Sequence, residues 1–154
     1  MKIALKYGLI ITVVVIVWIV IVRLILKVEP DSNVHVVGPL LFNIVAIIAI
    51  FLGMRAKKRE QNGELGFKQG LKVGMAISLV YAVSSCLFFL IQFLIAGPAL
   101  LMNEAGPVAG PVWRVAAIAY GGLFFGSLFF GLIYSTIIAF FLARMQGRES
   151  SELI

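Results

Sequence analysis

Four long stretches of this sequence contain no Lys, Arg, Asp or Glu. They cover residues 8–22, 32–54, 73–103 and 115–143, and the first continues over 24–26 past a single arginine. A hydrocarbon core of roughly 30 Å is crossed by about 20 residues of α-helix. Each stretch suits one crossing, and none is long enough for two crossings with a turn. The runs predict transmembrane helices over 5–27, 36–57, 66–96 and 112–145.

The composition agrees with this interpretation. Of the 154 residues, 62% are apolar and 13% are charged, whereas soluble domains have about 45–50% and 25%. This balance argues against a soluble enzyme, a disordered tail, a disulfide scaffold and a nucleic-acid-binding domain. Short alternating segments, which are typical of membrane β-barrels, do not occur. We therefore expect one all-α domain over 1–154, an integral membrane four-helix bundle.

The basic residues predict the orientation of the bundle. With the N-terminus in the cytoplasm, ten Lys and Arg side chains lie inside and three lie outside, as the positive-inside rule requires. Both termini are then cytoplasmic, with a cytoplasmic loop at 58–65 and external loops at 28–35 and 97–111. The first helix is too long for the apolar part of a signal peptide, which predicts an uncleaved anchor. The net charge of +6 needs no nucleic-acid partner.

Small residues recur every four positions on the last two predicted helices. Such spacing lets helix backbones approach closely in lipid, where no hydrophobic force drives association. One interpretation is packing within the bundle, and the alternative is a homodimer seam or a flexing point of a transporter. The helix-packing candidates are Gly66, Gly70, Gly74, Ser78, Gly122, Gly126, Ser127, Gly131 and Ser135.

Basic side chains near the helix ends are candidates for contact with lipid headgroups or a partner. Arg23 and Lys27 can extend to the headgroups, pair with Glu29, Asp31 or Glu104, or bind an anionic headgroup. A second group of basic residues lies around the predicted cytoplasmic loop. Its candidate roles are to attract anionic lipid, to determine topology or to bind a protein partner with an acidic face. It comprises Arg55, Lys57, Lys58, Arg59, Lys68 and Lys72.

Polar residues at membrane depth are few. Asn43, Ser84, Ser85 and Gln92 suit hydrogen bonds between helices, or alternatively a polar path for a solute. The single His35 and the single Cys86 build neither a zinc site nor a disulfide within one chain. We identify no catalytic, metal-binding or cofactor-binding residues and expect no enzyme and no cofactor.

The chain resembles the bacterial inner-membrane family known as domain of unknown function four-one-nine-nine. The resemblance depends on the segment 6–10 (KYGLI), the basic end of the second predicted helix, the segment 66–74 (GFKQGLKVG) and a glycine-rich last helix that ends in a basic residue. It implies four helices, a cytoplasmic hairpin between the second and third, and a location in the inner membrane. It implies no activity.

These observations favour a non-catalytic accessory or assembly subunit that acts through helix contacts. Its partners are membrane lipids and either another membrane protein or further copies of itself. The alternative is a small oligomeric channel or transporter, although the membrane cores hold no carboxylate of the kind that ion-coupled transporters use. A lipid-modifying enzyme is a third hypothesis, for which no nucleophile–base pair is evident.

Overall fold

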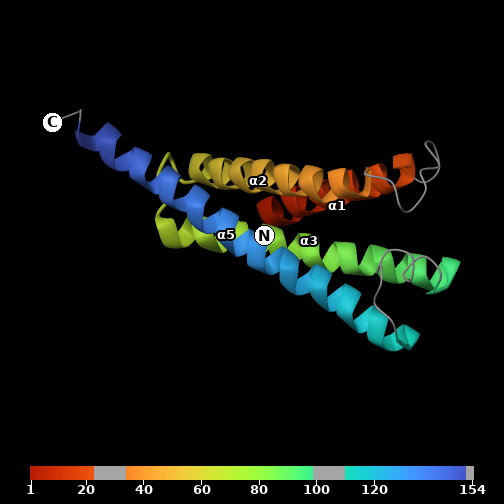
Figure 1. Ribbon diagram of the computed structural model, residues 1–154. Coiled ribbons are helices and arrows are strands. Elements are labelled where there is room, and N and C mark those ends of the chain that lie inside the picture. The colour runs from red at the N-terminus through yellow and green to blue at the C-terminus, as the bar shows by residue number, and fades with distance from the viewer. Residues whose placement is uncertain (23–33, 99–109, 152–154) are drawn as a thin grey trace.

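The described part of the chain forms four long helices (Figure 1). The computed structural model describes residues 1–22, 34–98 and 110–151. The helices are α1 (Lys2–Val20), α2 (Val34–Glu60), α3 (Phe67–Ala96) and α5 (Val112–Ser151). No strand occurs in these described ranges, and all four helices are long and apolar enough to cross a membrane. The predicted class, an all-α membrane protein with four helices, is confirmed.

The helix ends differ from the predicted ranges most in α1 and α5, while α2 begins two residues earlier and ends three residues later than predicted. α1 begins at Lys2 and its α-helical part ends at Val20, followed by a π-helical turn at 21–22. The end of the first predicted helix and most of the loop 28–35 lie outside the described residues, as does most of the loop 97–111. α5 continues to Ser151 rather than to 145, because helical hydrogen bonding does not stop where the apolar run stops.

A tight turn joins α2 to α3. Asn62 and Gly63 have φ values of 54° and 94°, and the Gly63 N–H donates to the Lys58 carbonyl over 3.0 Å. This is the 6→1 bond of a Schellman motif, which satisfies a carbonyl at the end of the helix. The Asn-Gly pair therefore ends α2 and returns the chain antiparallel to it.

α2 and α3 form the centre of the bundle. Each packs against every other helix, whereas the backbones of α1 and α5 do not come close to each other within the described residues. Ile50, Met54 and Ile77 from the central pair form the buried core with Ile11 of α1. α5 crosses the other helices obliquely (Figure 1). One part of α5 can therefore be in close contact with α3 while another part diverges from α2.

Small residues interlock α3 and α5. Three antiparallel pairs face each other: Gly70 with Ala139, Gly74 with Ser135, and Ser78 with Gly131. A Cβ built on Gly70 lies 3.0 Å from the Cβ of Ala139, and one built on Gly74 overlaps the Ser135 hydroxyl. The backbones thus approach more closely than any larger residue would allow. Such contact supplies the van der Waals energy that holds helices together in lipid.

Two further glycines allow α1 to pack closely against the central pair. A Cβ on Gly8 lies 2.6 Å from the Val80 Cβ and 2.9 Å from the Ile77 carbonyl oxygen. A Cβ on Gly53 of α2 overlaps Ile77 and lies 3.3 Å from the Tyr7 ring. A hydrogen bond of 2.6 Å between the hydroxyls of Thr12 and Ser84 also joins α1 to α3.

Candidate functional site

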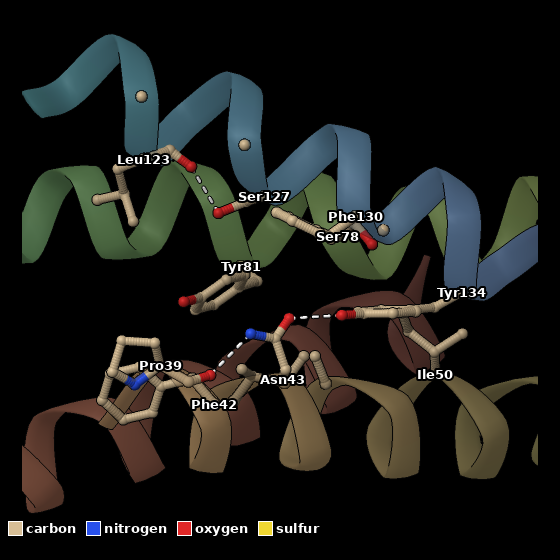
Figure 2. Close-up of a pocket in the computed structure, with 15 residues that line it drawn as sticks. Pro39, Phe42, Asn43, Ile50, Ser78, Tyr81, Leu123, Ser127, Phe130 and Tyr134 are labelled. Atoms are coloured by element: carbon tan, nitrogen blue, oxygen red, sulfur yellow. Dashed lines mark hydrogen bonds between the residues drawn. The ribbon is translucent and has the colours of Figure 1, made fainter. Parts of the chain in front are cut away.

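A cavity of about 250 Å³ lies between α2, α3 and α5 (Figure 2), and Ile11 of α1 also lines it. It is partly open at the molecular surface. All its lining residues lie within the four apolar spans, so it is at membrane depth. The lining comprises Ile11, Pro39, Phe42, Asn43, Ala46, Ile50, Ser78, Tyr81, Gly122, Leu123, Gly126, Ser127, Phe130, Gly131 and Tyr134.

Two glycines on α5 leave the space that the cavity occupies. A Cβ built on Gly122 or on Gly126 meets no atom within 4 Å. The close contact with α3 occurs about one turn further along α5, at Gly131. The same spacing of small residues thus forms a helix contact at one level and a hollow at another.

A short polar network crosses one wall of the cavity, from α5 to α2. The Tyr134 hydroxyl donates to Asn43 Oδ1 over 2.5 Å, and Asn43 Nδ2 donates to the Pro39 carbonyl over 2.7 Å (Figure 2). Ser127 is also at the wall, where its hydroxyl donates to the Leu123 carbonyl over 2.6 Å. The side chain of Tyr81 projects toward the cavity (Figure 2). Most of the remaining wall is apolar, which is typical of small-molecule sites with a few orienting polar groups.

The structure separates the four residues considered for a polar path. Asn43 lines the cavity. Ser84 faces α1, where it bonds to Thr12 and donates to the Val80 carbonyl. Ser85 is 1% exposed, and its hydroxyl has no partner among the described residues. Gln92 is half-buried in the last turns of α3. Of the four residues, Asn43 alone lines this cavity.

The helix-packing candidates also divide into groups. Gly70, Gly74, Ser78, Gly131 and Ser135 form the contact between α3 and α5. Three other candidates have different surroundings: Gly66 meets open space, and Gly122 and Gly126 line the cavity. Ser127 lines the cavity as well.

Basic side chains gather at one end of the bundle. Consecutive helices run in opposite directions, so this end of the bundle holds the start of α1, the end of α2 and the start of α3 (Figure 1). The apolar span of α5, which ends at Arg144, also ends there. Lys57 pairs with Glu60 over 3.0 Å. Arg23 and Lys27 lie outside the described residues. The basic residues described at this end are Lys2, Lys6, Arg55, Lys57, Lys58, Arg59, Lys68, Lys72 and Arg144.

Four aromatic members of the cavity were not predicted from the sequence: Phe42, Tyr81, Phe130 and Tyr134. In helices that are apolar on nearly every side, an aromatic residue carries no signal of the direction it faces. Tyr134 and Asn43 are 91 positions apart, and only the packing of α5 beside α2 brings them together. The sequence signal that could point to this cavity was a polar residue within an apolar span. Among the lining residues, the set chosen on that signal contains only Asn43.

The fold and the comparisons define the class and the family of this protein. Four helices that can each cross a bilayer make it a multi-pass membrane protein. A family model described as "Protein of unknown function (DUF4199)" matches residues 6–105. This match covers more than half of the chain, so the protein belongs to that family. No curated protein and no solved structure matches the chain.

Proposed function

We propose that this protein is a non-catalytic accessory subunit that acts through helix contacts with another membrane protein. The unequal burial of the helices carries the proposal. In the most apolar part of α5, 17% of residues are buried in the bundle, against 28% for each of the other three helices. α5 therefore offers the largest share of helix surface to a neighbour.

One face of α5 is suited to such a neighbour. We call it the outer face and define it by Ile118, Phe125, Phe129, Leu132, Thr136 and Phe140, whose spacing of three, four or seven places them on one side of a helix. Phe125 and Phe129 are 70% and 61% exposed. Their rings offer a large area for van der Waals contact, which drives helix association in lipid. The partner that this face would accept is an apolar transmembrane helix of another chain.

The test is purification of the tagged protein from native membranes in a mild, lipid-retaining detergent, with the mass and composition of the intact particle measured. We expect a second protein in stoichiometric amount. The Phe125→Ala/Phe129→Ala variant should recover about tenfold less of it, because truncating central interface aromatics costs about 1–2 kcal/mol. The matched control is Leu94→Ala/Ile95→Ala, which removes exposed apolar side chains of α3.

Two results would contradict the proposal. One is a particle that contains only this chain and lipid. The other is a partner whose recovery is the same in the Phe125→Ala/Phe129→Ala variant and the control. A particle of several identical chains would instead favour self-association.

We infer that the basic end of the bundle faces the cytoplasm of a bacterial inner membrane. The positive-inside rule and the family resemblance support this orientation and location. The test uses Cys86→Ser as background, with Glu64→Cys at the basic end or Val112→Cys at the opposite end. A membrane-impermeant maleimide should label the cysteine at 112 in intact cells and the cysteine at 64 only after lysis. The reverse pattern would overturn the orientation.

A further inference from the structure

The cavity between α2, α3 and α5 points to a second function, independent of the helix partner. We propose that it binds one neutral, lipid-soluble molecule in which a hydrocarbon portion is joined to a hydrogen-bonding oxygen.

The size and walls of the cavity suit a hydrocarbon portion. A volume of about 250 Å³ far exceeds the roughly 30 Å³ of one water molecule and approaches the ~300 Å³ at which small-molecule pockets begin. Ile11 and Ile50 line its inner side, and the rings of Phe42 and Phe130 add aromatic surface. A chain or flat ring would contact apolar groups on several sides.

The route of entry and the charge of the lining restrict the ligand. The cavity is partly open at the surface, at membrane depth, and Gly122 in its lining is exposed. Molecules dissolved in the bilayer therefore reach it most directly. Its lining contains no Asp, Glu, Lys, Arg or His. A charged ligand would be desolvated there without a counter-charge, at high cost, so the structure favours a neutral one.

The polar network provides a place for an oxygen atom. Asn43 has two amide N–H donors, and its bond to the Pro39 carbonyl uses one of them. Its carbonyl oxygen is held by the Tyr134 hydroxyl, which orients the amide in the cavity wall (Figure 2). The second N–H can therefore donate to a ligand carbonyl or hydroxyl. Tyr81 projects toward the same space.

Two kinds of membrane molecule share this chemistry. A glycerolipid carries ester carbonyls on hydrocarbon chains, and an isoprenoid quinone carries ring carbonyls on an apolar tail. Both are neutral at the oxygen that Asn43 would meet. The probes are therefore dioctanoylglycerol and decyl-benzoquinone, each titrated into the full-length, delipidated protein in detergent micelles.

Native mass spectrometry and equilibrium titration measure the binding. We expect one molecule of one probe per chain, and the probe that saturates identifies the source. Gly126→Leu should weaken binding at least about tenfold, which corresponds to 1.4 kcal/mol, because its side chain fills the cavity. Asn43→Leu should weaken binding by removing the donor while keeping the size of the side chain.

Gly121→Leu is the matched control. Gly121 is also on α5 and a Cβ built there meets no atom within 4 Å, but it is not in the cavity lining. It should bind the probe like the wild type. Helix content and thermal unfolding of each variant show that it is folded, and Gly122→Leu replaces Gly126→Leu if that variant is not.

Absence of saturable binding to either probe would overturn the proposal, as would equal affinity for wild type and a folded cavity-filling variant. Neither result depends on the outer face of α5, so failure here is distinguishable from failure of the accessory-subunit proposal.

Discussion

Replacing Gly74 by leucine is expected to destabilise the protein by about 3 kcal/mol, the upper end of the cost of overpacking a core. A Cβ at this position overlaps the Ser135 hydroxyl and lies 2.6 Å from the Met54 methyl group. Neither neighbour can withdraw easily, because Ser135 and Met54 are both 0% exposed. Leucine gains about 1 kcal/mol over glycine in helix propensity, so the net change is still a loss. Unfolding in mixed micelles, followed by circular dichroism, measures it.

A reciprocal exchange tests whether the close contact is the cause. Gly74→Ser alone should destabilise, and adding Ser135→Gly should restore most of the loss, because the pair then has the same total volume with its members exchanged. Gly121→Leu is again the control, since open space surrounds that position, and it should be neutral or slightly stabilising. Unchanged stability of Gly74→Leu would show that α3 and α5 do not pack as described.

Replacing Gly8 by leucine is expected to loosen α1 from the bundle, at a cost of about 2 kcal/mol from overpacking. The new side chain would meet the Val80 Cβ at 2.6 Å and the Ile77 carbonyl oxygen at 2.9 Å. The carbonyl belongs to a helix backbone and cannot rotate away as a side chain can. α1 must therefore move outward, which also strains the bond between Thr12 and Ser84.

Protease sensitivity of α1 and thermal unfolding measure this loosening. Val13→Leu is the control on the same helix, because Val13 is 56% exposed. Val80→Ala should partly relieve Gly8→Ala, since it removes Cγ1, one of the two Val80 atoms that lie 2.6 Å from a Cβ at position 8. If Gly8→Leu and Val13→Leu unfold at the same temperature, the contact between α1 and α3 is not close at Gly8.

The α3–α5 contact and the cavity are linked through the position of α5. Gly131 fixes α5 against Ser78, and Tyr134, less than one turn further, bonds to Asn43 on α2. Gly122 and Gly126 lie on the other side of this anchor, where the oblique course of α5 leaves the cavity. We therefore expect Gly74→Leu to impair the cavity as well as stability.

The sequence by itself determined the class of protein and the number of crossings. Hydrocarbon offers no hydrogen-bond partner for the backbone N–H and C=O groups. A charge-free run of bilayer length can therefore satisfy these groups within itself only as a helix. The turn at Asn62-Gly63 likewise depends on local sequence, because the left-handed conformation favours those residue types. These features depend on local composition and on the solvent.

Only the tertiary structure decided what each small or polar residue does. Gly70 and Gly74 have the same spacing as Gly122 and Gly126, yet the first pair packs against α5 and the second lines a cavity. Spacing defines a face of one helix, but not which neighbour lies against it or at what angle the neighbour crosses. Four helices that are apolar on nearly every side leave that choice to the shapes of the packed surfaces.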